Sequence, residues 1–464
     1  MARLKFPFTY NKKETSPFHV ICAQSIDLLP KSLQDIATQY GLKDGKKFMH
    51  NNTIILGASE NALKTGRAVF MAVKAFLPYD VKVSVSAPSK DSKYIKDLVT
   101  GIKLQAYEFL QYKTTFPEDF NQSAFSFEII GGDQKDIEDY DPVIEAVMEA
   151  RDFGNEPPNI LYPETFAKRI EKLFEGLPVK VTVFDEKELE KRKMGGVLAV
   201  GQGSSKPPRL VTLEYKKGSK TEAPLAFVGK AITFDTGGIS IKPAAHMEDM
   251  RHDMCGGAAV AGLFYALAKR GAKVNAIGVI GMAENMPDGN AYRPADIVKT
   301  ASGKTIEIFN TDAEGRVVLA DALWHAASFN PKLIVDLATL TGAITVALGS
   351  IFAGIFTESD ALSQKLIEAG HKVGEPLWRM PLHKQFTKDI TSKVADVRNT
   401  SAGKGAGSST AAAFLREFVP KEIDWCHMDI AGVAYSIVSE HITNEGASGF
   451  GVRLLDEFVR EYED

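Results

Sequence analysis

The apolar positions of the first 135 residues fall into short runs separated by stretches with helical spacing. Runs at 18–22, 53–56, 81–85 and 125–130 predict strands, and residues 62–76 predict a helix. Strands that alternate with helices predict a small α/β unit. His19 and His50 are isolated in this region and are interpreted as ordinary surface or core histidines, so no chemistry is assigned to this unit.

A helix and a turn separate this unit from the rest of the chain. Residues 139–151 carry apolar residues on one helical face, and Pro142 suits a first helical turn. The sequence Phe-Gly-Asn-Glu-Pro-Pro-Asn at 153–159 then favours a turn. These features predict an N-terminal α/β domain at 1–138, a linker helix and turn at 139–157, and a second domain at 158–464.

The second domain also alternates strands with helices. Apolar runs at 179–184, 225–230 and 274–280 predict strands, whereas 163–174 and 255–269 predict helices. The second of these helices is rich in glycine and alanine, which allows close packing against a sheet. A Gly/Ser-rich loop at 399–410 precedes a predicted helix at 411–418. The pattern predicts a larger α/β domain.

The sequence Asn-Thr-Asp-Ala-Glu-Gly-Arg at 310–316 is the most unusual stretch of the chain. The apolar residues before it suggest a strand, and 317–327 has helical spacing, so the stretch is predicted to be a strand-to-helix turn. Asp312 and Glu314 repel each other unless a cation lies between them, and oxygen ligands suit divalent metals. Taken alone, the stretch is better explained as a solvated turn with a capping aspartate.

Further charged residues lie among apolar strand residues and glycines. These are Lys230, Asp235, Lys242 and Asp253. A charged group next to buried strand residues is costly unless it is paired or neutralised. Each could alone be part of a structural ion pair. Together with Asp312 and Glu314 they give four carboxylates and two lysines at predicted loop ends, which favours a divalent metal site.

Several other catalytic or binding motifs do not fit. Gly201-x-Gly203 follows an apolar segment that suggests a strand, but the third glycine of a nucleotide-binding loop is absent and Pro207-Pro208 blocks a helix. The chain has no P-loop, no His-Glu-x-x-His and no Gly-x-Ser-x-Gly elbow. The second-domain histidines nearest the charged stretches are therefore interpreted as supporting residues at most, namely His246, His252 and His427.

Length and composition set broader limits. A chain of 464 residues is long enough for two or three domains, and 44% hydrophobic with 25% charged residues is typical of a globular protein. The net charge of −4 gives no basic surface that predicts nucleic-acid binding. Three well-separated cysteines favour a reducing compartment. With no apolar leader and no run of about 18 apolar residues, the prediction is a cytoplasmic protein that does not enter membranes.

The motifs together resemble the cytosol (leucyl) aminopeptidase family of two-metal exopeptidases. The stretch at 310–316 matches the signature of that family in full. The resemblance covers the second domain from about residue 158 to the end, with matching segments in the family's order at 229–243, 253–256, 283–286, 336–343 and 429–432. The N-terminal part carries no family motif.

The resemblance implies a fold and a set of functional residues. The second domain would be a catalytic metallopeptidase domain with a mixed central sheet flanked by helices. Two divalent ions, zinc or manganese or magnesium, would be bound there. One ion would be held by Asp235, Asp312 and Glu314, and the other by Lys230, Asp235, Asp253 and Glu314. Lys242 and Arg316 would be catalytic, with a bicarbonate on Arg316, and the substrate would contact Thr339, Leu340 and Gly342.

The implied activity is release of N-terminal amino acids, leucine and similar ones, from peptides with a free N-terminus. The resemblance also implies a homo-hexamer. Ala231, Thr236 and Ala434 depart from residues common in the family, but none is an implied metal ligand. Two alternatives stay open at this point: a two-metal phosphoesterase, and a non-enzymatic DNA-associated regulator built on the same fold.

Overall fold

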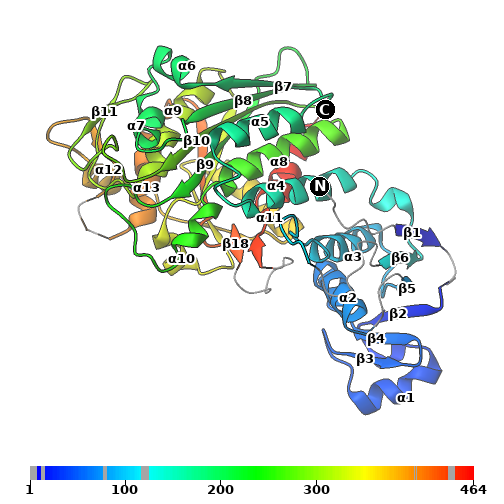
Figure 1. Ribbon diagram of the computed structural model, residues 1–464. Helices are drawn as coiled ribbons and strands as arrows, with labels where there is room; N and C mark the ends of the chain where they lie inside the picture. Colours follow the sequence, from blue (N-terminus) through cyan, green and yellow to red (C-terminus); the bar gives the residue numbers. More distant parts are fainter. Residues whose placement is uncertain are drawn as a thin grey trace. The chain divides into compact units, whose positions relative to one another are not determined.

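The computed structural model describes residues 8–11, 16–76, 81–115, 125–401, 403, 405–436 and 445–463, and the labels used here are those of Figure 1. These residues form two compact units; the main division falls between Ile144 and Glu145, and Glu445 belongs to the first unit. The main division lies inside helix α4 (Asp141–Asn155), which covers most of the predicted linker helix and extends into the predicted turn.

The first unit contains one six-stranded sheet in the order β1-β6-β5-β2-β4-β3. Neighbouring strands are parallel except for β3, which runs antiparallel to β4. The predicted α/β class is confirmed, and α2 has the predicted bounds. The elements are β1 (Phe8–Asn11), β2 (Phe18–Ala23), α1 (Lys31–Tyr40), β3 (Lys47–His50), β4 (Thr53–Gly57), α2 (Ala62–Phe76), β5 (Val81–Ser86), α3 (Ser92–Gln105) and β6 (Phe125–Ile130).

The second unit is built on an eight-stranded mixed sheet in the order β15-β14-β17-β13-β9-β10-β8-β7. Its central strands β17, β13, β9 and β10 are parallel. The strands of this sheet are β7 (Val179–Phe184), β8 (Arg209–Lys216), β9 (Leu225–Asp235), β10 (Asn275–Asn285), β13 (Leu333–Ala338), β14 (Ala353–Phe356), β15 (Leu377–Arg379) and β17 (Asp424–Asp429).

Helices cover both faces of this sheet (Figure 1). A side chain at Gly278 would meet Phe264 of α8, whereas one at Gly281 would meet Val318 of α9, so α8 and α9 lie on opposite faces. The helices of the unit are α5 (Pro163–Leu173), α6 (Glu186–Lys191), α7 (Gly195–Gly201), α8 (Cys255–Arg270), α9 (Glu314–Ala327), α10 (Gly342–Leu348), α11 (Asp360–Val373), α12 (Lys384–Asp389), α13 (Gly407–Arg416) and α14 (Val452–Arg460).

One local prediction was wrong, and two differ from the structure in their bounds. The strand expected directly before Gly201 is part of helix α7, because the Asp321 carboxylate accepts from the backbone N–H groups of Gly196 and Val197 and begins a helix there. The strand before residue 310 is only three residues long, β12 (Thr305–Glu307), and belongs to a separate sheet with β11 (Ile297–Lys299) and β16 (Val397–Arg398). Helix α13 begins four residues earlier than predicted, inside the Gly/Ser-rich segment.

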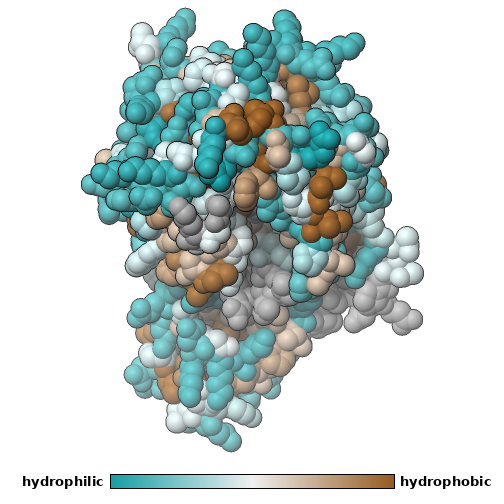
Figure 2. All heavy atoms as spheres, turned by 90° about the vertical axis from the view of Figure 1, so that its left-hand side faces the viewer, coloured by the Kyte–Doolittle hydropathy of each residue, from teal (hydrophilic) through white to brown (hydrophobic). Residues whose placement is uncertain are grey.

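Most large apolar residues are buried, and those that are exposed are scattered over the surface. The face in Figure 2 is mostly hydrophilic, with separate hydrophobic patches. Scattered apolar residues of this kind are normal on globular proteins. Within the described ranges, no helix has the length and apolar content needed to cross a membrane.

A buried histidine of α9 gives the second unit a pH-dependent stability. His325 is 8% exposed, its Nε2 lies 3.0 Å from Thr212 Oγ1, and its ring meets Phe184 and Phe329 edge-on. Burial, with a smaller effect of Arg192, lowers the pKa of His325 to about 4. An unfolded histidine titrates near pH 6.5, so the unfolded state alone gains this proton between about pH 6.5 and 4. The native state therefore loses stability as pH falls, by about 2 kcal/mol at pH 5.

We expect the His325→Gln variant, which cannot titrate, to lose about 2 kcal/mol less unfolding free energy than the wild type between pH 7.5 and 5. Urea unfolding in EDTA measures this without a contribution from bound metal. The exposed His371 in α11 supplies the control, and His371→Gln should behave as the wild type. Equal losses in the wild type and His325→Gln would contradict the prediction.

Candidate metal centre

The carboxyl ends of the central parallel strands bring the predicted charged residues to one edge of the sheet. Lys230 and Asp235 lie on β9, and Asn285 ends β10. Thr339 directly follows β13, and Asp429 ends β17. Ligand sites in open α/β sheets typically lie at this edge.

A β-bulge in β9 places two of these residues on the same face of the sheet. Lys230 and Asp235 are five positions apart and would point to opposite faces of a regular strand. The pairing with β10 skips Thr233, which is an extra residue in β9. Because a bulge inserts one residue without a partner, it restores Lys230 and Asp235 to the same face.

Lys230 is almost completely buried, and its ammonium group makes three polar contacts. Its Nζ lies 2.8 Å from Asp253 Oδ2 and 2.9 Å from Glu314 Oε1, and it donates to the Thr339 carbonyl at 2.9 Å. Burial lowers the pKa of Lys230, but the nearby carboxylates raise it more, so the net pKa lies above the ordinary value. Without a metal, this lysine is an ammonium ion that pairs with both Asp253 and Glu314.

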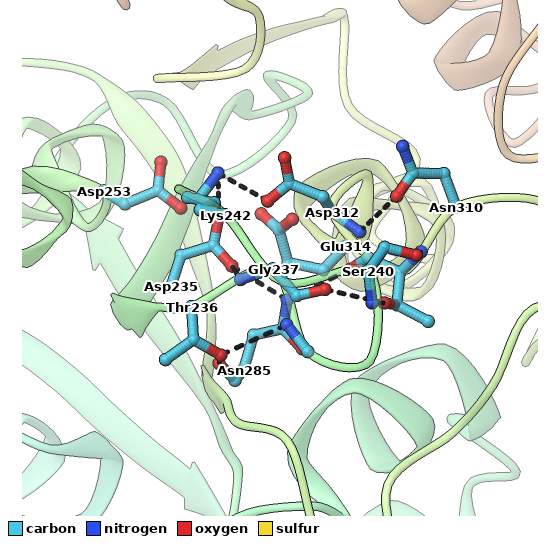
Figure 3. Close-up of polar contacts among 12 residues, drawn as sticks. Asp235, Thr236, Gly237, Ser240, Lys242, Asp253, Asn285, Asn310, Asp312 and Glu314 are labelled. Atoms are coloured by element: carbon cyan, nitrogen blue, oxygen red, sulfur yellow. Dashed lines mark hydrogen bonds and ion pairs between the residues drawn. The ribbon is translucent and has the colours of Figure 1, made fainter. Parts of the chain in front are cut away.

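Lys242 enters the same space from the loop after β9 (Figure 3). Its Nζ lies 2.9 Å from Asp235 Oδ2 and 2.5 Å from Asp312 Oδ1. The loop turns back through Gly237 and Gly238, whose φ angles of +85° and +64° favour glycine. Its turn is closed by the Lys242 N–H, which donates to the Thr236 carbonyl at 2.9 Å.

The cluster contains more negative than positive charge. Ligand oxygens of Asp235, Asp312 and Glu314 lie within 4.8 Å of one another, and Asp253 completes a set of four carboxylates around only two lysines. Burial and the charge of Glu314 raise the pKa of Asp235 to about 6, and burial raises the pKa of Asp253 well above its ordinary value. Closely spaced oxygen ligands with excess negative charge fit hard or borderline divalent cations. The residues present therefore suit a metal centre.

Arg316 lies in the first turn of α9, two residues beyond Glu314. It is 7% exposed, and one terminal nitrogen donates to the Asn399 carbonyl at 2.8 Å. Its Nε has no hydrogen-bond partner among the residues that the structure describes. Burial lowers the pKa of Arg316 to about 10. A buried guanidinium with an unused donor is suited to binding a small planar anion.

The segment after β13 borders the carboxylate cluster. The Thr339 hydroxyl donates to Asp253 Oδ1 at 2.7 Å. Leu340 is half-buried, and Gly342 begins α10. An added side chain at Gly342 would meet no atom of the described residues within 4 Å, so the backbone there faces open space among them.

The histidines remain outside the cluster. His427 Nδ1 lies 2.6 Å from Asp336 Oδ1, and both side chains are fully buried. The ring of His252 stacks on Tyr435 with 3.8 Å between centroids. His246 is exposed. None of the three belongs to the group of candidate ligands found among the described residues.

Asn285 also supports the centre, although no role was predicted for it. Its Nδ2 donates to Asp235 Oδ1 at 2.8 Å and to the Thr311 carbonyl at 3.0 Å. It thereby ties the end of β9 to the turn that carries Asp312. The segment at 283–286 that matches the family includes Asn285, but its uncharged side chain did not indicate which residue it would contact.

A model of the cytosol aminopeptidase family, catalytic domain, matches residues 148–456. This match spans more than half of the chain and includes all six charged residues of the centre. The chain belongs to the cytosol aminopeptidase family. As a member of this family, the chain is a metal-dependent peptidase of the aminopeptidase type.

Individual relatives agree with this family assignment. A probable cytosol aminopeptidase of Agrobacterium fabrum is 53% identical over 376 residues, which cover 79% of this chain and 75% of that protein. A probable cytosol aminopeptidase of Rhodopseudomonas palustris is 47% identical over 448 residues, covering 93% and 87% of the two chains. The solved structure of the bottromycin maturation enzyme BotP in complex with Mn is 30% identical, with a TM-score of 0.86, and the match covers 96% of this chain and 99% of that one.

A substitution at Gly315 tests whether the activity of this aminopeptidase-family chain depends on the position of Lys230. A side chain at Gly315 would lie 2.6 Å from Lys230 Nζ and 2.5 Å from its Cε. The lysine end must then move away from Asp253, Glu314 and Thr339. We expect Gly315→Ala to lower kcat/KM by about 10- to 100-fold, since small displacements of a catalytic constellation are costly.

The kinetics of Gly315→Ala are compared with those of Gly289→Ala. An added side chain at Gly289 meets nothing within 4 Å, so this control should keep wild-type activity. If Gly315→Ala keeps the wild-type kcat/KM, the position of the Lys230 side chain does not limit activity, and the prediction is contradicted.

Proposed function

We propose that this chain releases N-terminal amino acids, leucine and similar ones, from peptides with a free N-terminus, using two divalent metal ions. The observation that carries the proposal is the set of four buried or half-buried carboxylates and two lysines at one sheet edge, with three ligand oxygens within 4.8 Å. The free α-amino group of the substrate would bind beside the metal ions and the carboxylates. Hydrolysis would therefore be restricted to the first peptide bond.

The ligand sets of the proposal follow the positions of the carboxylates. Asp235, Asp312 and Glu314 would hold one ion, and Lys230, Asp235, Asp253 and Glu314 the other. Zinc, manganese and magnesium are the candidate ions, and the manganese in the BotP structure supports manganese as the first to test. When bound, two such ions lower the pKa of water and polarise the peptide carbonyl. Lys230 would take part only as the neutral amine.

Lys242 is proposed to stabilise the oxyanion that develops during hydrolysis. Its side chain is 21% exposed, whereas that of Lys230 is 3% exposed, so the ammonium of Lys242 is accessible to a substrate. Its attraction to Asp235 and Asp312 weakens once those carboxylates are neutralised by ligation. The ammonium can then donate to a substrate oxygen, the kind of preorganised donor that contributes strongly to catalysis.

Arg316 is proposed to bind bicarbonate and, through it, to help move a proton. The unused Nε and the low exposure of Arg316 support this role. Thr339, Leu340 and Gly342 are proposed to contact the substrate. The open space at Gly342 and the contact of Thr339 with Asp253 support their position beside the reacting bond.

The two alternatives are less well supported. A phosphoesterase does not account for the family match, and all predicted catalytic side chains of a peptidase are present. A non-enzymatic regulator would not require this cluster of buried charges, whose burial costs folding free energy. A cytoplasmic location, a homo-hexamer, and the absence of nucleic-acid and membrane partners remain predictions.

Metal removal and replacement tests the proposal. The chelated protein should hydrolyse neither leucine p-nitroanilide nor bis(p-nitrophenyl) phosphate, and manganese or zinc should restore hydrolysis of the anilide only. Restored hydrolysis of the phosphate diester would support the phosphoesterase. No hydrolysis of either compound with manganese, zinc or magnesium, in protein shown to be folded, would favour the regulator.

A further inference from the structure

Asp429 is a buried carboxylate outside the predicted metal ligands. It ends β17 and is completely shielded from solvent. Its Oδ1 accepts from the backbone N–H of Leu340 at 3.1 Å and from that of Ala431 at 3.3 Å. Its Oδ2 accepts from the Thr341 hydroxyl at 2.7 Å. Two of its three partners therefore belong to the segment that borders the metal centre.

The hydrogen bonds of Thr341 fix the direction of this contact. The Thr341 hydroxyl lies 2.9 Å from the Ser408 hydroxyl and accepts from the Ile344 N–H at 3.2 Å, as the N-cap of α10. A hydroxyl has one hydrogen to donate and two acceptor positions. Because a carboxylate can only accept, Thr341 donates to Asp429, and Ser408 donates to Thr341. Every hydrogen-bonding position of the Thr341 hydroxyl is then used.

The same segment is tied to the metal centre at its other end. The Thr339 carbonyl accepts from Lys230 Nζ at 2.9 Å, and the Thr339 hydroxyl donates to Asp253 at 2.7 Å. Residues 339–341 thus run between the candidate ligands on one side and Asp429 on the other. The Leu340 N–H is used by Asp429, so it is not available to a substrate, whereas the backbone at Gly342 faces open space.

We infer that Asp429 is a positioning residue for peptide binding, which sets the backbone orientation of residues 339–342 at the metal centre. This inference rests on the proposed function, because it takes Thr339, Leu340 and Gly342 as substrate contacts. Asparagine at 429 would keep one oxygen for Leu340, but its amide could donate to the Thr341 hydroxyl only if the hydrogen bond between Ser408 and Thr341 reversed its direction. The contact between β17 and the start of α10 would be weakened with little change in volume.

The Asp429→Asn variant tests the inference. We expect KM for leucine p-nitroanilide to rise about 10- to 100-fold, with kcat within about threefold of the wild type and unchanged manganese content. Asp336→Asn is the matched control, since Asp336 is equally buried on neighbouring β13 but bonds to His427 and Trp425 instead. The control should leave KM unchanged. An unchanged KM in Asp429→Asn, or an equal rise in the control, would overturn the inference.

Thr341 variants test the same contact independently of how well Asp429→Asn folds. Thr341→Ser keeps the hydroxyl and should retain the wild-type KM, whereas Thr341→Val should raise KM as Asp429→Asn does. The double variant should be no worse than the poorer single variant, because both changes remove one contact. Fully additive effects, or equal KM values in the Ser and Val variants, would overturn the inference. A wild type that is inactive with every metal would instead overturn the proposed function and this inference with it.

Discussion

The Asp235→Asn variant is expected to lose at least about 10³-fold in kcat/KM and to bind fewer metal ions than the wild type. Asp235 is the proposed bridge between both ions, so the substitution removes a negative ligand from each. The asparagine oxygen can still accept from Asn285 and Gly237, as Asp235 Oδ1 does at 2.8 and 2.9 Å. The backbone should therefore stay in place while the charge is lost.

Metal content by mass spectrometry and steady-state kinetics measure both parts of this result. Asp249→Asn is the control, because Asp249 is an acidic residue of the short 3₁₀ helix just before Asp253 that lies outside the candidate ligand group. It should retain full metal content and activity. An Asp235→Asn variant that keeps two ions per chain and wild-type kcat/KM would show that Asp235 is not a bridging ligand.

Removal of the Lys242 ammonium is expected to lower kcat about 10²- to 10³-fold with little change in KM, because its proposed interaction forms in the transition state. Lys242→Gln should keep its metal ions, since no ligand is lost. Lys242→Arg retains the charge and should recover part of the loss. Kinetics of the three proteins at saturating manganese measure this effect. A kcat of Lys242→Gln within threefold of the wild type would contradict the oxyanion role.

The charged residues of the centre could be predicted because charge is costly among apolar strand residues. Lys230 and Asp235 stand out within one apolar run, and Asp312 and Glu314 stand out before an apolar helix. The strand and helix patterns also predicted the α/β class. These features depend on local sequence, where the periodicity of burial is directly visible.

Features that depend on tertiary contacts could not be predicted. The bulge at Thr233 decides that Lys230 and Asp235 share a face, and it is visible only in the pairing of β9 with β10. Helix α7 was predicted as a strand because its start depends on Asp321, more than a hundred positions away. Asp429 likewise meets Leu340 and Thr341 across nearly ninety residues, so its role had no local signal.

The most direct test of the central claim compares two forms of one leucine-initiated peptide, one with a free amine and one N-acetylated. Mass spectrometry of the digestion by manganese-loaded protein identifies every product. We expect loss of N-terminal leucine from the free peptide and no cleavage of the acetylated one. Cleavage of the acetylated peptide, or of an internal bond in the intact free peptide, would contradict an aminopeptidase that recognises the free N-terminus.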